Sequence, residues 1–79
     1  MTIKVLGMGC ANCHRLEENV SRAVAELSLE ATIEKVTDFP AILAYGVSST
    51  PALVVDERVV AAGRVPDIRQ IRTLLAGVR

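Results

Sequence analysis

Residues 50–55, Thr50-Pro51-Ala52-Leu53-Val54-Val55, contain a proline that leads directly into an apolar run of strand length. Proline suits the first residue of a strand because it cannot donate a ladder hydrogen bond. A second apolar run, Val59-Val60-Ala61-Ala62, follows the polar residues Asp56-Glu57-Arg58. The two runs predict an antiparallel hairpin. We expect a long or strained turn, because a tight two-residue turn favours glycine or asparagine over Asp56 and Glu57.

The segments on both sides of this hairpin predict helices and one further strand. Gly63 ends the hairpin, and Pro66 begins a last helix with an apolar stripe of Ile68, Ile71, Leu74, Leu75 and Val78. Upstream, Asp38 is the expected N-cap of a short helix that has Pro40 in its first turn and stops at Gly46. Residues 31–36 are rich in β-branched side chains, which favours a strand.

The N-terminal third predicts a strand followed by an amphipathic helix. Residues 2–6 are mostly apolar, and Gly7 and Gly9 follow them. From Cys13 onward the apolar positions recur at helical spacing, at Leu16, Val20, Ala23, Val24 and Leu27. The predicted order is therefore β-α-β-α-β-β-α, an α/β fold with a four-stranded mixed sheet flanked by helices. We expect one domain over residues 1–79.

The chain's two cysteines form the motif Cys10-Ala11-Asn12-Cys13 at the predicted helix start. Two thiols at this spacing can close a disulfide or bind one soft metal ion. A helix N-terminus favours a thiolate, so Cys10 is the candidate nucleophile. Cys13 continues the apolar stripe, so it should face inward as the resolving thiol. His14 lies four residues after Cys10 and could favour its thiolate, although an exposed polar residue is the simpler interpretation.

Composition limits the classes of function. Nine Lys plus Arg balance nine Asp plus Glu, which argues against binding nucleic acid through whole-domain charge. No run approaches the roughly 18 apolar residues of a membrane span, and the N-terminus lacks the pattern of a signal peptide. We expect a cytoplasmic protein, where a cysteine pair at this spacing is more often catalytic or metal-binding than structural. Five arginines against one aspartate in residues 58–79 could contact an acidic partner, although a solvated helix face is the simpler account.

Two motifs together resemble the thioredoxin superfamily: the cysteine motif after a first strand, and Tyr45-Gly46-Val47-Ser48-Ser49-Thr50-Pro51 before an apolar strand. Residues 50–55 and Gly63-Arg64-Val65-Pro66 are similar to the small thioredoxin-like proteins called redox-active disulfide protein 2, and the likeness covers about Ile3 to Leu75. It implies a thiol-disulfide oxidoreductase without metal or cofactor, acting on a protein disulfide or a dedicated redox partner. It also implies a cis bond at Thr50-Pro51 facing the cysteines, with the Thr50 backbone pairing with an extended substrate. Gly9 and Asn12 depart from the tryptophan and proline that thioredoxins often carry there, which bears on the redox potential.

Three alternatives remain open from the sequence. Gly7-Met8-Gly9 and the cysteine motif also resemble the copper(I)-binding loop of heavy-metal-associated domains. Those domains run β-α-β-β-α-β, however, whereas this chain ends in a hairpin and a helix. Zinc or an iron-sulfur cluster would need ligands from a second subunit, although we expect a monomer. A redox-responsive interaction module without turnover is the third alternative.

Overall fold

The computed structural model describes residues 1–7 and 11–77. Its elements follow the predicted order and are β1 (Thr2–Leu6), α1 (Ala11–Leu27), β2 (Thr32–Val36), α2 (Phe39–Ala44), β3 (Ala52–Val55), β4 (Arg58–Ala62) and α3 (Ile68–Gly77). The predicted α/β class and four-stranded mixed sheet are confirmed. Among the described residues, no helix is long and apolar enough to cross a membrane.

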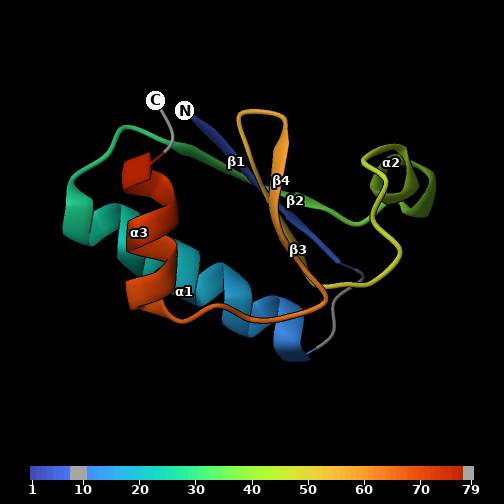
Figure 1. Cartoon of the computed structure of the whole chain (residues 1–79), viewed down its shortest axis with the longest axis horizontal. Helices are drawn as coiled ribbons and strands as arrows, with labels where there is room; N and C mark the ends of the chain where they lie inside the picture. The colour runs from blue at the N-terminus through green and yellow to red at the C-terminus, as the bar shows by residue number, and fades with distance from the viewer. Residues whose placement is uncertain (8–10, 78–79) are drawn as a thin grey trace.

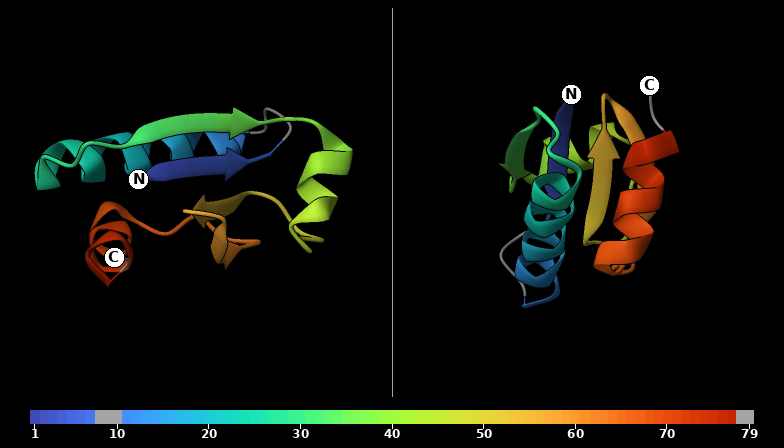
Figure 2. Two further views of the ribbon diagram at one scale, coloured as in Figure 1. Left: turned by 90° about the horizontal axis from the view of Figure 1, so that it is seen from above. Right: turned by 90° about the vertical axis from the view of Figure 1, so that its left-hand side faces the viewer.

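The strands lie in the order β2-β1-β3-β4, with helices on both faces of the sheet. β1 runs parallel to β2 and antiparallel to β3, and β3 runs antiparallel to β4. The helices α1 and α3 cover one face, whereas α2 lies on the other (Figures 1 and 2). The C-terminal end of β1 therefore lies between the end of β2 and the start of β3, because Leu6 pairs with both Val36 and Ala52.

Each face of the sheet has its own apolar cluster. The buried strand β3 contributes to both, since Leu53 and Val55 face α1 and α3 while Ala52 and Val54 face α2. The larger cluster lies under α1 and α3 and contains Ile3, Val5, Leu16, Val20, Ala23, Leu53, Val55, Ala61, Ile71 and Leu75. The smaller one lies under α2 and contains Leu6, Ile42, Val47, Ala52 and Val54.

The predicted stripe of α1 is buried along most of its length. Cys13, Leu16, Val20 and Ala23 are buried, but Leu27 is 36% exposed. Leu27 is the last residue of α1, a helix of 17 residues that is longer than the strands beneath it. By the usual rise per residue, α1 spans about 25 Å and a five-residue strand about 17 Å.

The two shorter helices begin in different ways. Asp38 occupies the N-cap of α2, but its side chain makes no capping hydrogen bond. At α3, the Asp67 carboxylate accepts a hydrogen bond from the Gln70 amide at 2.7 Å, and the Asp67 amide donates to the Gln70 side chain at 3.0 Å. This reciprocal capping box places the start of α3 at Ile68, two residues after the Pro66 start that the sequence indicated.

The β3–β4 turn is tight and strained, in agreement with the expectation of a long or strained turn. Asp56 and Glu57 are its two central residues, with φ of 48° and 68°. The Asp56 amide donates to the Thr2 carbonyl, and the Asp56 carboxylate accepts from the Thr2 amide, both at 2.8 Å. These contacts with β1 stabilise a backbone conformation that glycine or asparagine usually adopts.

Glu57 is held by a cluster of three side chains from different elements. The Lys4 ammonium lies 2.8 Å from Glu57 and also donates to the Tyr45 hydroxyl at 2.8 Å. The Tyr45 hydroxyl donates to the other Glu57 oxygen at 3.1 Å. The hydrogen bond from Lys4, and to a smaller extent the one from Tyr45, holds the pKa of Glu57 below its ordinary value. The hydrogen bond to Glu57 in turn raises the pKa of Lys4.

A β-bulge interrupts β4. Val54 pairs with Val59 but Leu53 pairs with Ala61, so Val60 is an extra residue in β4. Val60 and Ala61 consequently both pack on the cluster beneath α1 and α3.

Candidate active site

Cys13 lies in the first turn of α1 and faces the sheet. Its exposure is 6%, which confirms the inward orientation predicted from the helical stripe. It is disulfide-bonded, so the structure describes the oxidised state of this sulfur. Cys10, the proposed nucleophile, lies outside the described residues, as do Met8 and Gly9.

Gly7 is the residue directly beneath Cys13. A Cβ atom at Gly7 would collide with the Cys13 sulfur and come within 3.0 Å of the Cys13 Cβ. The Gly7 amide donates to the Val36 carbonyl at 3.0 Å, which continues the β1–β2 pairing one residue past Leu6. The absence of a side chain at Gly7 thus lets α1 place its sulfur against the end of β1.

The strand registers place four residues in a row across this end of the sheet. Because Leu6 pairs with Val36 and Ala52, Gly7 is level with Thr37 on one side and Pro51 on the other. Ala52 pairs with Ala62, so Gly63 is level with Pro51, and its amide donates to the Pro51 carbonyl at 2.9 Å. We call Thr37, Gly7, Pro51 and Gly63 the sheet-end row. The start of α1 and the segment entering β3 lie at this same end (Figure 1).

Thr50 and Pro51 therefore lie beside the end of β1, against which α1 places Cys13. The Thr50-Pro51 peptide bond is cis, Pro51 is buried and Thr50 is exposed. Gly63 adopts a φ of 72°, and a Cβ there would lie 3.1 Å from the Ser49 Cβ. Glycine at this position lets β4 pass close to the loop that carries Thr50.

A small cavity of about 90 Å³ adjoins Cys13 between α1 and the β1–β2 end. Glu17 and Lys35 form an ion pair of 3.2 Å among its lining residues. His14 is exposed and also lines the cavity, but its relation to Cys10 lies outside the described residues. The lining residues are Val5, Gly7, Cys13, His14, Glu17, Lys35 and Thr37.

The sequence identified Cys13, Thr50 and Pro51, which the fold brings to one end of the sheet. It did not assign a role to Gly7, Gly63 or the Glu17–Lys35 pair. Glycine at the end of a strand was an available signal for the first two. Within residues 1–7 and 11–77, no group of three or more His, Cys, Asp or Glu side chains could hold a metal ion.

An α/β sheet with a cysteine at a helix start, beside a cis-proline that leads into an antiparallel strand, defines the thioredoxin-like class. The sequence model of the Thioredoxin domain family matches residues 1–76, and the chain belongs to this family. Two curated relatives are each named Thioredoxin. The protein from Methanothermobacter thermautotrophicus is 40% identical over 76 residues, covering 96% of this chain and 99% of the relative. The protein from Methanocaldococcus jannaschii is 38% identical over 72 residues, covering 91% and 83%.

Proposed function

We propose that this chain is a thiol-disulfide oxidoreductase in which Cys10 attacks and Cys13 resolves. Membership of the thioredoxin family supports this class of reaction in general. The observation that carries the division of roles is the burial of Cys13 at 6% exposure, directly above Gly7. A shielded sulfur is poorly placed for the first attack on a protein disulfide but well placed to displace a neighbouring mixed disulfide.

The proposed reaction consists of two thiol-disulfide exchange steps. The Cys10 thiolate attacks one sulfur of the substrate disulfide, so a mixed disulfide forms and the first substrate thiolate leaves. The Cys13 thiolate then attacks the Cys10 sulfur, which releases the second substrate thiolate and leaves a Cys10–Cys13 disulfide. The substrate gains two electrons, which the dithiol loses.

Thr50 and Pro51 are the proposed substrate-groove residues. Thr50 is exposed, and the cis bond that it forms with Pro51 places it next to the sheet-end row, where Gly7 contacts Cys13. We propose that the Thr50 backbone pairs with that substrate. His14 remains a candidate for favouring the Cys10 thiolate, and action as a cytoplasmic monomer of one domain remains a prediction.

The test compares the two cysteine variants with the wild type after anaerobic purification. We expect Cys10→Ser to abolish exchange with glutathione disulfide and Cys13→Ser to trap mixed disulfides, detectable by mass spectrometry. We also expect an alkylating reagent to modify Cys10 of the reduced protein near neutral pH well before Cys13. Equal reactivity of the two thiols, or exchange that survives Cys10→Ser, would contradict the assignment. Stoichiometric copper(I) without exchange would instead identify a metal carrier, which the element order does not favour.

A further inference from the structure

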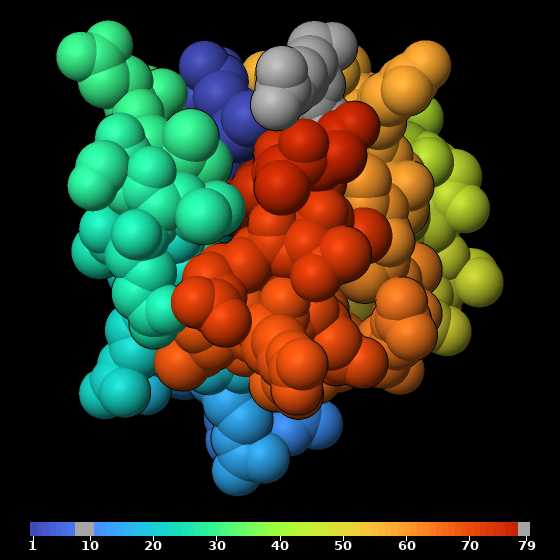
Figure 3. Space-filling view, turned by 60° about the vertical axis from the view of Figure 1, so that its left-hand side comes forward, coloured from blue at the N-terminus to red at the C-terminus, as the bar shows by residue number. Residues whose placement is uncertain are grey.

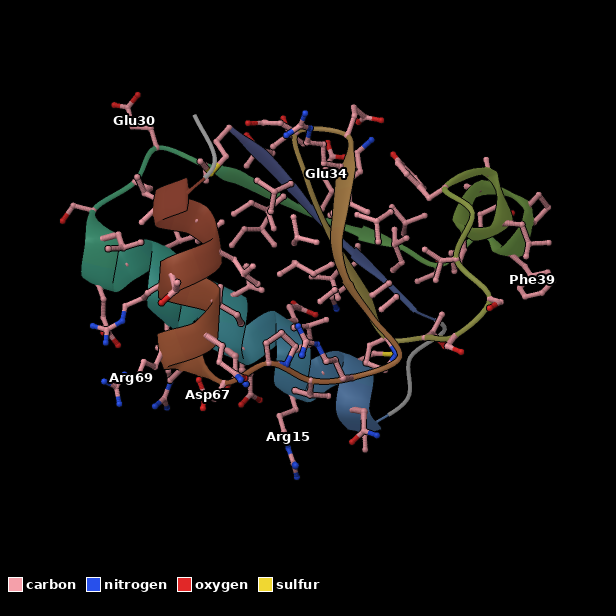
Figure 4. The ribbon with its side chains drawn as sticks, viewed as in Figure 1. Arg15, Glu30, Glu34, Phe39, Asp67 and Arg69 are labelled. Carbon is pink, nitrogen blue, oxygen red and sulfur yellow. The ribbon has the colours of Figure 1, made fainter. Side chains whose placement is uncertain are left out.

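An open hollow with two arginines lies on the surface at the start of α3. Its volume is about 340 Å³, and it is lined by Arg64, Arg69, Gln70, Thr73 and Leu74. Arg64 and Arg69 are both exposed. α3 crosses the middle of the face shown in Figure 3, and Arg69 points away from the sheet in Figure 4. We call this feature the arginine hollow.

The two guanidinium groups have no anionic partner in the described part of the chain. The ion pairs found there are Lys4–Glu57, Lys35–Glu17 and Arg72–Glu26. Two other polar groups of the hollow already have partners, since the Gln70 side-chain oxygen accepts from the Asp67 amide and the Thr73 hydroxyl donates to the Arg69 carbonyl. Asp67, the nearest acidic residue in sequence, accepts its hydrogen bond from the Gln70 amide. Arg64 and Arg69 are therefore available to bind an anion.

The position of the hollow connects it to the sheet-end row. Gly63 is level with Pro51 and hydrogen-bonded to it, and Arg64 is the next residue of the chain. The Asn19 side chain, in the third turn of α1, donates to the Pro66 carbonyl at 3.0 Å and fixes the loop that leads to α3. A polypeptide lying along Thr50 and Gly63 would thus pass close to Arg64.

We propose that the arginine hollow binds an acidic segment of the protein whose disulfide is exchanged at the cysteine pair. The proposal rests on the proposed function and names the chemistry of its partner. Arginine recognises carboxylates through two parallel hydrogen bonds, and the half-buried Leu74 offers apolar contact beside them. In a chain of zero net charge, this local excess of positive charge would orient an acidic partner toward the site.

The test uses two synthetic peptides of equal length, each with one internal disulfide, flanked by Asp and Glu in one and by Lys in the other. We expect the reduced wild type to reduce the acidic peptide with the higher kcat/KM. The double variant Arg64→Gln/Arg69→Gln should lose about tenfold in kcat/KM on the acidic peptide alone, and each single variant about threefold. The difference should shrink in 0.5 M salt, because exposed charges are then screened within a few ångströms.

Two controls separate this proposal from the proposed function. Arg58→Gln removes the same charge at the opposite end of β4 and should leave the preference unchanged. Bis(2-hydroxyethyl) disulfide is small and neutral, so the double variant should reduce it at the wild-type rate. Equal rates on the two peptides in the wild type, or an equal loss with Arg58→Gln, would overturn the docking site.

Binding without chemistry provides an independent readout. An acidic peptide with serine in place of both cysteines should shift the amide resonances of Gln70 and Thr73 in the wild type and leave them unshifted in the double variant. This shift in a protein that reduces no disulfide would support the hollow and contradict the proposed function. Its absence at millimolar peptide would contradict the hollow, whatever the exchange rates.

Discussion

Gly7 is the residue on which the position of the buried sulfur most directly depends. Its amide continues the pairing with β2 while its missing side chain leaves space for Cys13. The inward orientation of Cys13 was predictable, because it follows from helical spacing with Leu16 and Val20 within one element. The contact with Gly7 was not, because it depends on how closely α1 approaches β1, which is a long-range property.

We predict that Gly7→Ala destabilises the protein by about 1–3 kcal/mol, the usual cost of forcing a methyl group into a packed site. The reason is the collision of the new Cβ with the Cys13 sulfur. Urea unfolding of the oxidised protein measures the loss. Gly77→Ala is the matched control, because a Cβ there meets nothing within 4 Å, and it should change stability little. A Gly7→Ala protein as stable as wild type would show that the contact can relax.

At the scale of elements, α2 and α3 are each preceded by an aspartate, but only one of these two side chains makes a capping hydrogen bond. The sequence predicted Asp38 as an N-cap, and its position is confirmed, yet its carboxylate makes no capping hydrogen bond. Asp67 was not singled out, although Gln70 three residues later completes the capping-box spacing. The sequence instead predicted that the helix starts at Pro66, because proline is common at the first helical position.

We predict that Asp67→Ala lowers the free energy of unfolding by about 1 kcal/mol, the typical effect of losing an N-cap side chain. Asp38→Ala is the matched control and should lower it by less than about 0.5 kcal/mol, as for most surface substitutions. Chemical denaturation of both variants beside the wild type measures the difference. Equal losses would mean that the capping hydrogen bonds of Asp67 contribute nothing measurable.

At the scale of the whole molecule, three distant segments meet at the Lys4–Tyr45–Glu57 cluster. Lys4 belongs to β1, Tyr45 follows α2, and Glu57 is in the β3–β4 turn. The sequence indicated the order of the elements and the strain in this turn, because both depend on local residue types. It gave no sign of the cluster, since the three side chains come together only after the strands have paired.

We predict that Glu57 makes stability depend on pH at the acidic end. Its pKa is lowered in the folded protein by Lys4 and Tyr45, so the unfolded chain takes up a proton first as the pH falls. The stabilisation should be complete well above pH 4.5, the ordinary value, and should decrease as the pH falls through the lower folded pKa. Urea midpoints between pH 3 and 9 should show wild type and Glu57→Gln converging in acid.

Glu34→Gln provides the control for this pH series. Glu34 is exposed on β2 and belongs to none of the ion pairs of the described residues. Its neutral variant should follow the wild-type pH curve. If Glu57→Gln kept a constant difference from wild type down to pH 3, the ionised carboxylate would not be the source of the stabilisation.

The bulge at Val60 determines which residue at the end of β4 lies level with Pro51. With regular pairing from the turn onward, Ala62 would be level with Pro51, and Gly63 would fall one position beyond it. The extra residue restores Gly63 to that place, where a methyl group would press on Ser49. A relative whose β4 is one residue shorter could pair regularly and still keep glycine there. A single-residue deletion at this bulge would therefore change the length of β4 and still leave glycine level with Pro51.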